Sequence, residues 1–177
     1  NINIWELINL ANKHPRVNIL NPGSGVGGHC IAVDPYFIIS KYPRESVLIK
    51  QSRDVNNYKS DWCINKINLE IEKYNTEKSK KPTVALLGIS FKPDIDDLRE
   101  SPALMITKKV INSKKANFLI VEPNIENYND FEISDLDYAL SKSDILVFLV
   151  SHKEFKNIEL SNKIVIDFVN HNKSFKN

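Results

Sequence analysis

Two patterns of apolar residues divide the chain into two parts. In the first part apolar side chains recur at helical spacing between residues 3 and 13, which predicts an amphipathic helix that ends at His14-Pro15. Asp34-Pro35 predicts the start of a second helix, with Asp34 as a candidate N-cap. A longer helix is predicted over residues 44–75. Its apolar side consists of Val47, Leu48, Val55, Tyr58, Trp62, Ile64, Ile67 and Ile71.

The second part follows a polar, charged connector at residues 77–82. Short apolar runs bounded by turn residues predict strands there, and they alternate with helical patterns. The predicted strands cover residues 83–87, 117–121, 144–150 and 163–168, with helices at 101–111 and 136–140. This alternation is typical of a parallel sheet with helical crossovers. The sequence therefore predicts an α/β fold with a helical unit, residues 1–80, and a Rossmann-like parallel-sheet domain, residues 81–177.

Composition narrows the classes of function. The 177 residues carry a net charge of +2, from 24 basic and 22 acidic side chains, which does not favour nucleic-acid binding. Apolar runs such as Ile145–Val150 are too short to span a bilayer, and because the first residues carry no basic n-region we expect no signal peptide. Two cysteines do not make a disulfide framework, so we expect a cytoplasmic protein. Because no initiator Met is present, we expect the sequence to begin inside a longer protein.

The glycine-rich segment before Cys30 allows two interpretations. Gly23 to Gly28 (GSGVGG) formally matches the G-x-G-x-x-G pattern of a dinucleotide-binding turn. That turn needs a preceding strand and an acidic residue roughly 20 positions later at a strand end. Asn21-Pro22 interrupts the entry, and Glu45 lies in a predicted helix. We therefore interpret the match as accidental.

Cys30 is the candidate nucleophile. It lies after the glycine loop and before a helix, where backbone N–H groups and the helix dipole favour a thiolate. Asp34, four residues later, is placed to hold a water molecule or accept a proton. The alternative is an inert, buried cysteine in a tight turn. A pair between His29 and Cys30 of the protease type is disfavoured, because adjacent side chains point in different directions.

Two long motifs resemble the UDP-glucose/GDP-mannose dehydrogenase family. The first runs from Pro22 to Pro35 (PGSGVGGHCIAVDP) and the second from Leu87 to Pro102 (LGISFKPDIDDLRESP). Within that family the segments at residues 5–12 and 14–20 are most similar to the branch that oxidises UDP-N-acetyl-D-mannosamine. The UDP-glucose branch usually has a lysine at the position of Val33. The resemblance covers nearly the whole chain and weakens after about residue 160.

The resemblance implies an NAD-dependent oxidation of the C6 hydroxymethyl group of a UDP-sugar to a carboxylate. By analogy Cys30 attacks the C6 aldehyde to give a thiohemiacetal, a second hydride transfer gives a thioester, and water hydrolyses it. Asp34 occupies the acidic position that handles this water or proton. Such a product serves polysaccharide biosynthesis.

The family motifs also imply binding residues. His14 and Arg16 match positions that reach the nucleotide sugar, in the site of a partner subunit, and Gly27 matches a backbone contact to substrate. Phe91 and Lys92 match a pair that binds the UDP moiety.

Arg99 matches a residue that approaches NAD in the complete enzyme. The alternative role of Arg99 is a salt bridge with Asp96 or Asp97. No role in the reaction is assigned to His152, and Trp62 and Cys63 are expected to pack structurally.

The resemblance further implies that the NAD-binding domain, with the catalytic lysine and asparagine of the central helix, precedes Asn1. A basic residue expected shortly after Asp167 is replaced by Phe168-Val169-Asn170-His171, and His171 or Lys173 are candidate substitutes. No metal is implied.

Three hypotheses follow. The chain is the C-terminal part of a UDP-N-acetyl-D-mannosamine-oxidising enzyme, inactive alone and homodimeric or a higher homo-oligomer. It belongs to an enzyme for UDP-glucose or another nucleotide sugar. Or it is a non-catalytic nucleotide-sugar-binding or dimerisation module.

Overall fold

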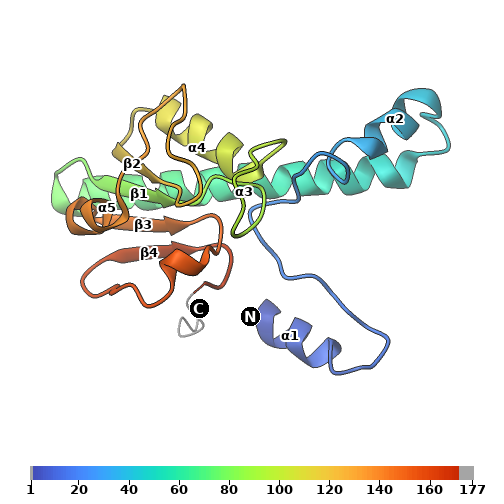
Figure 1. The fold of residues 1–177 in the computed structure, drawn as a ribbon, viewed down its shortest axis with the longest axis horizontal. Helices are drawn as coiled ribbons and strands as arrows, with labels where there is room; N and C mark the ends of the chain where they lie inside the picture. The colour runs from blue at the N-terminus through green and yellow to red at the C-terminus, as the bar shows by residue number, and fades with distance from the viewer. Residues whose placement is uncertain (1, 172–177) are drawn as a thin grey trace.

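The computed structural model describes residues 2–171, which fold into a parallel sheet with helices on both faces and a helical extension to one side (Figure 1). The extension contains α1 (Ile4–Ala11), α2 (Asp34–Lys41) and the N-terminal part of α3 (Val47–Lys78). The sheet domain contains β1 (Thr83–Leu87), α4 (Pro102–Asn112), β2 (Asn117–Val121), α5 (Leu136–Lys142), β3 (Ile145–Phe148), the short 3-10 helix η1 (Lys153–Phe155) and β4 (Ile164–Asp167).

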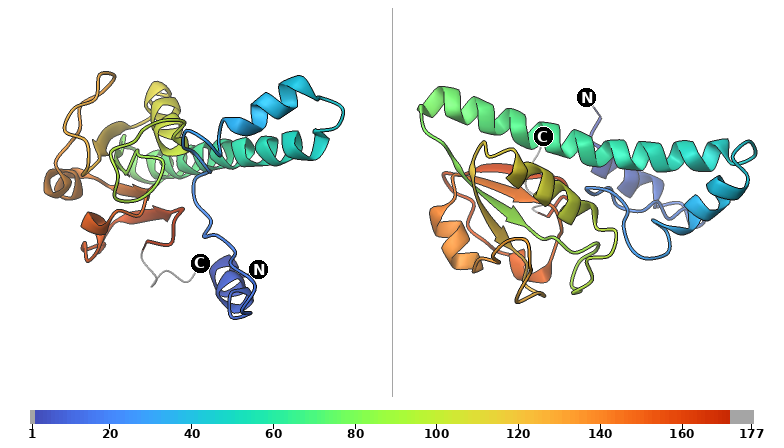
Figure 2. Two further views of the ribbon diagram at one scale, coloured as in Figure 1. Left: turned by 45° about the vertical axis from the view of Figure 1, so that its right-hand side comes forward. Right: turned by 90° about the horizontal axis from the view of Figure 1, so that it is seen from above.

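The four strands are parallel in the order β2-β1-β3-β4, so all of their carboxyl ends lie at one edge. Each strand is a short apolar run, and successive side chains point to opposite faces. Val84 and Leu86 pack with α3 and α4, whereas Ala85 and Leu87 pack with α5 and η1. The predicted α/β fold is confirmed, and Figure 2 shows the helices on the two faces of the sheet.

The long helix α3 is buried along only half of its length. Cys63, Ile67 and Ile71 are fully buried against the sheet domain. The apolar residues of its first turns are exposed, Leu48 to 79% and Tyr58 to 67%. The reason is geometric: the helix extends beyond the sheet, which covers only its second half (Figure 1).

Several predicted boundaries differ from the structure; β3, for example, is Ile145–Phe148 where residues 144–150 were predicted. The first helix ends at Ala11, before His14-Pro15. The expected connector is partly helical, because α3 continues to Lys78 and ends on Ser79 in the left-handed conformation. Asp34 is the first residue of α2 and not its N-cap; that position belongs to Val33, which makes no side-chain cap. Within residues 2–171, no helix is long and apolar enough to cross a membrane.

Candidate functional site

Polar groups gather at the carboxyl edge of the sheet, where parallel sheets bind ligands. The turn after β1 carries Ser90, Phe91 and Lys92, and the segment after β3 carries Ser151 and His152. A cleft of about 1490 Å³ opens at this edge. Its sides come from the turn after β1, the start of the glycine loop, the inner side of α1 and the middle of α3.

The charge of this cleft is mostly positive. Among the described residues that line it are four lysines, Lys13, Lys59, Lys92 and Lys156, against a single carboxylate, that of Glu6. Phe91 and Trp5 add aromatic surface beside these cations. A cleft with lysine ammonium groups and aromatic faces suits an anion attached to a planar ring, because the cations attract phosphate and the rings stack.

The glycine loop packs directly on the second motif. The backbone N–H of Gly28 donates to the carbonyl oxygen of Arg99 at 3.1 Å. A Cβ on Gly27 would lie 2.3 Å from the carbonyl oxygen of Glu100, and one on Gly28 would lie 3.1 Å from the Phe91 ring. The glycines therefore allow two segments far apart in sequence to approach each other closely.

Cys30 is exposed in a turn that leads into α2. Its carbonyl oxygen accepts from the N–H of Val33 at 3.0 Å and of Asp34 at 2.8 Å, and the Asp34 side chain is exposed. The other thiol differs: burial raises the pKa of Cys63 to about 11, although the charge of Lys59 acts in the opposite direction. Cys63 packs structurally, as expected, so Cys30 is the accessible thiol of the pair.

Arg99 lies beside Cys30 and is held by a carboxylate. Its Nε lies 3.0 Å from both carboxylate oxygens of Asp97, and its Nη2 lies 2.6 Å from Oδ2. These hydrogen bonds, together with one from the Arg99 backbone, lower the pKa of Asp97 to about 2. The same pairing raises the pKa of Arg99, with a smaller contribution from the nearby Cys30 thiol. The salt-bridge role expected for Arg99 is present, and its partner is Asp97.

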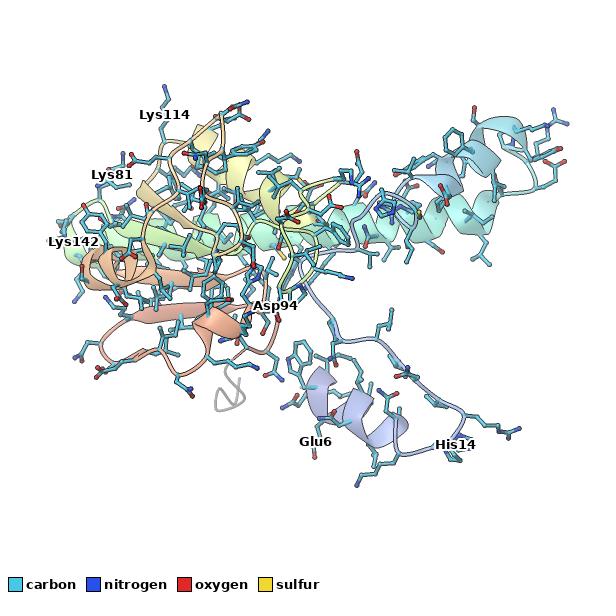
Figure 3. All side chains as sticks on the ribbon, in the orientation of Figure 1. Glu6, His14, Lys81, Asp94, Lys114 and Lys142 are labelled. Carbon is cyan, nitrogen blue, oxygen red and sulfur yellow. The ribbon has the colours of Figure 1, made fainter. Side chains whose placement is uncertain are left out.

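His14 and Arg16 are not brought to this site. They lie in the segment that links α1 to the glycine loop, with the backbone N–H of Arg16 donating to His14 Nδ1 at 3.2 Å. Figure 3 shows His14 at the far end of that segment from the sheet domain. Within one copy of the chain these two residues are thus separate from Phe91 and Lys92.

The C-terminal segment adds His171 to the cleft. Its ring stacks on Phe148 with centroids 4.9 Å apart, and Ser151 Oγ lies 2.6 Å from its Nδ1. Its backbone N–H donates to Asp167 Oδ1 at 3.2 Å. An imidazole therefore occupies the region where the family motif has a basic residue, while Lys173 lies outside the described residues.

Sequence reasoning missed a buried pair at the same edge. Glu122, directly after β2, and His152, after β3, lie with Oε2 and Nε2 3.1 Å apart, and both side chains are fully buried. The available signal was positional: both polar residues follow the carboxyl ends of parallel strands, β2 and β3, which flank β1, so their side chains reach the same edge of the sheet.

Comparison with known proteins gives two family matches. Residues 85–173 match the UDP binding domain of the UDP-glucose/GDP-mannose dehydrogenase family, and residues 1–58 match its central domain. The chain is 48% identical over 171 residues to a UDP-N-acetyl-D-mannosamine dehydrogenase from Campylobacter jejuni, which covers 93% of this chain and 40% of that protein. It is 43% identical over 173 residues to an NDP-N-acetyl-D-galactosaminuronic acid dehydrogenase from Ralstonia solanacearum, with 94% and 40% covered.

Among solved structures, a UDP-N-acetyl-mannosamine dehydrogenase from S. aureus is similar with a TM-score of 0.79 and 36% identity. The match covers 98% of this chain and 41% of that one. The chain thus spans about two fifths of the length of the relatives it matches. Its fold, the order of its two motifs and both family matches agree. The chain belongs to the UDP-glucose/GDP-mannose dehydrogenase family.

Proposed function

We propose that this chain supplies the catalytic thiol and the UDP-binding domain of an NAD-dependent nucleotide-sugar 6-dehydrogenase. The observation that carries the proposal is the packing of the Cys30 loop on the Phe91–Lys92 turn, at the edge of a cationic cleft. In this division of roles, residues 1–80 provide the thiol and the end of the central domain. Residues 81–177 bind the nucleotide.

Phe91 and Lys92 are suited to the two halves of UDP. The Phe91 ring, partly buried, offers a face on which uracil can stack. The exposed Lys92 ammonium lies 6.0 Å from the centroid of that ring, a spacing that lets it approach a diphosphate while the base stacks beside it. By analogy with the family motif, Gly27 would offer a backbone contact to the sugar, whereas the N–H groups of Val26 and Gly28 already donate to Asn56 and Arg99.

Cys30 would carry the second oxidation. Its sulfur adds to the C6 aldehyde carbon, the carbonyl oxygen gains a proton, and a thiohemiacetal forms. Loss of a hydride from C6 and of the hydroxyl proton gives a thioester. Water then adds to the thioester carbon, the C–S bond breaks, and the carboxylate and free thiol result. Asp34, exposed and one helical turn from Cys30, is placed to accept a proton from that water.

NAD, when bound, would accept the hydride in each oxidation. The residues of this chain fit it only at one point. Arg99 offers an exposed guanidinium next to Cys30. The glycine run does not fit a pyrophosphate, since the space beside Gly27 is filled by Glu100 and Pro102. Among residues 2–171, the contact with NAD is thus assigned to Arg99.

UDP-N-acetyl-D-mannosamine is the substrate that we propose. Support comes from the C. jejuni and S. aureus relatives and from Val33 at the position where the UDP-glucose branch has lysine. His14 lies away from the site of its own copy in Figure 3, and the backbone N–H of Arg16 donates to its ring, which supports a homodimer in which both reach the partner subunit's site.

Calorimetry with UDP and GDP tests the nucleotide site. We expect UDP to bind and GDP to bind more weakly, and Lys92→Ala to weaken UDP about 10- to 100-fold, as for the loss of a charge-assisted hydrogen bond. Lys142→Ala, on the far side of the sheet domain in Figure 3, is the matched control and should bind like the wild type. Equal affinity of both variants would contradict the assignment.

Activity separates an enzyme from a binding module. In the complete enzyme that contains this chain, NAD reduction with UDP-N-acetyl-D-mannosamine should stop short of the uronic acid in Cys30→Ser. Cys63→Ala, which removes the buried thiol, should retain turnover. UDP binding with no turnover, and no effect of Cys30→Ser, would instead support a non-catalytic module. Faster turnover of UDP-glucose would transfer the activity to the other branch.

A further inference from the structure

His152 is a buried histidine to which the proposed reaction assigns nothing. Its side chain is 0% exposed and lies behind the turn that carries Phe91 and Lys92. Glu122, also buried, faces it from the residue after strand β2, which lies on the other side of β1 from β3. A buried polar ring needs hydrogen-bond partners on both nitrogens, and the identity of these partners determines its tautomer.

The partners fix the proton on Nε2. Nδ1 accepts from the backbone N–H of Asp94 at 3.0 Å, and the Asn124 amide nitrogen lies 3.1 Å away. A backbone N–H only donates, so Nδ1 must be unprotonated. The proton on Nε2 then points to Glu122 Oε2 at 3.1 Å and to Ser90 Oγ at 3.2 Å.

Glu122 is held as a charged acceptor. Its Oε2 accepts from the backbone N–H groups of Ile89 at 2.8 Å and Ser90 at 3.1 Å, and its Oε1 accepts from Asn124 N at 3.1 Å. Burial alone would raise the pKa of this carboxyl, but hydrogen bonds from His152 and the Ile89 backbone outweigh it and lower the pKa. Because the Glu122 carboxylate accepts from Nε2, it stabilises the tautomer of His152 that carries its proton on Nε2.

The same imidazole holds both ends of the turn. Ser90 stands at one end and donates from Oγ to the Lys92 carbonyl oxygen at 2.9 Å. Asp94 stands at the other end, with φ of 62°, and donates its N–H to the ring. Phe91, Lys92 and Pro93 therefore lie between two residues that contact one side chain. Because left-handed backbone is costly for a residue other than glycine, the bond at Asp94 stabilises a conformation that is otherwise disfavoured.

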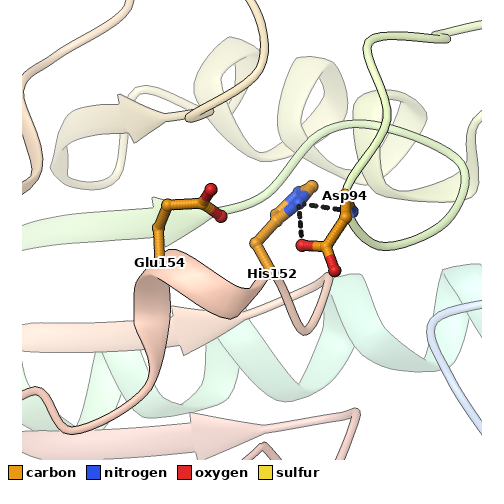
Figure 4. Close-up of side chains that lie close together, drawn as sticks. All are labelled: Asp94, His152 and Glu154. Atoms are coloured by element: carbon orange, nitrogen blue, oxygen red, sulfur yellow. Dashed lines mark hydrogen bonds and ion pairs between the residues drawn. The ribbon is translucent and has the colours of Figure 1, made fainter.

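A cation site formed by the same residues is a weaker interpretation. Ligand atoms of Asp94, His152 and Glu154 lie within 4.8 Å of one another. Figure 4 draws these three side chains. The lone pair of His152 Nδ1 is already used by the Asp94 N–H, and Asp94 Oδ1 accepts from Lys153 N at 2.9 Å. A metal ion would have to displace the hydrogen bond from the Asp94 N–H, because Nδ1 has a single lone pair.

We propose that His152 is a positioning residue for the nucleotide: its unprotonated Nδ1 sets the conformation of turn 90–94 and thereby the placement of Phe91 and Lys92. The inference rests on the proposed UDP site. It assigns the effect to one nitrogen of the ring, which makes it separable from a general requirement for a buried side chain at this position.

Two amide variants separate the acceptor function of Nδ1 from the donor function of Nε2. In His152→Asn the side-chain oxygen takes the place of Nδ1 and can accept from Asp94, whereas the donor to Glu122 is lost. In His152→Gln the amide nitrogen takes the place of Nε2 and can donate to Glu122, whereas the acceptor for Asp94 is lost. Both remove the ring, so both are expected to lower the melting temperature.

The test measures UDP affinity by calorimetry and exchange of the Asp94 amide by NMR in the wild type and both variants. We expect His152→Gln to weaken UDP about tenfold or more and to speed Asp94 exchange by a similar factor, with His152→Asn close to the wild type in both. Wild-type affinity and exchange in His152→Gln, or equal losses in the two variants, would overturn the positioning role. If the wild-type chain bound no UDP, the proposed function would fail, and Asp94 exchange in the two variants would still decide whether His152 holds the turn.

Discussion

Replacing Gly27 by alanine is the most direct perturbation of the contact between the two motifs. The added Cβ would lie 2.3 Å from the Glu100 carbonyl oxygen and 2.7 Å from Pro102 Cδ, well inside the 3.0 Å that real Cβ atoms essentially never cross. Neither neighbour is free to move. Glu100 has a φ of 49°, and the next residue, Ser101, donates to the Ile89 carbonyl oxygen at 2.7 Å and caps α4.

The loop must therefore separate from the sheet domain rather than deform it. Overpacking of this kind costs about 1–3 kcal/mol, which corresponds to about a 5- to 150-fold shift in the equilibrium between the packed and released loop. Because Gly27 lies outside both hydrophobic clusters, the released loop leaves the core intact. The urea midpoint of global unfolding should therefore change little.

Amide exchange at Gly28 reports the release, since its N–H donates to the Arg99 carbonyl oxygen across the contact. We expect this amide to exchange about 5- to 150-fold faster in Gly27→Ala. Gly23→Ala is the matched control, because a Cβ at Gly23 meets nothing within 4 Å. If Gly28 exchanged equally fast in both variants, the close approach of the two segments would not be what requires a glycine at position 27.

Two further outcomes follow from the titratable groups. In native protein at pH 8 the exposed Cys30 should react rapidly with iodoacetamide. Burial raises the pKa of Cys63 to about 11, so this thiol should react only after unfolding. Mass spectrometry of the labelled peptides measures both rates, and faster labelling of Cys63 would contradict the prediction. The pKa of Glu122 is lowered from 4.5, so its contribution to stability is present above that pH and is lost as pH falls through the folded value. Urea unfolding should show a larger deficit of Glu122→Gln at pH 7 than at pH 4, and a constant deficit would contradict the assignment.

The sheet domain was predictable from the sequence because its strands are short apolar runs. The strands at Thr83–Leu87 and Asn117–Val121 match the predicted bounds, and the pattern inside them separates the two buried faces. Periodicity in α3 predicted the helix but not its burial. Helical spacing shows that one side of a helix is apolar. How much of that side is buried depends on how far the sheet extends along the helix, which tertiary packing determines.

The site was predictable only in part, for a related reason. The sequence of the glycine loop identified Cys30 as a candidate residue, and the second motif identified Phe91 and Lys92. Their contact through Gly28 and Arg99 joins residues about 70 positions apart, which no local pattern encodes. The pair of Glu122 and His152 was hidden because each is an ordinary polar residue at a strand end, and only the order of the strands places them 3.1 Å apart.

The geometry of the glycine loop changes how its sequence pattern should be interpreted. Three of its glycines face the second motif: Gly25 lies against Pro102, Gly27 against Glu100 and Pro102, and Gly28 against the Phe91 ring. The glycine run therefore resembles a phosphate-binding turn only in its sequence. The atoms that approach these glycines closely belong to the protein itself and not to a ligand. It follows that a ligand which moves Phe91 also moves the surface on which Gly28 packs, two residues before Cys30. If the proposed nucleotide site at Phe91 is occupied, a ligand that moves this ring would alter the placement of Cys30 through the Gly28 contact, and by reciprocity a change at the Cys30 loop would alter nucleotide affinity.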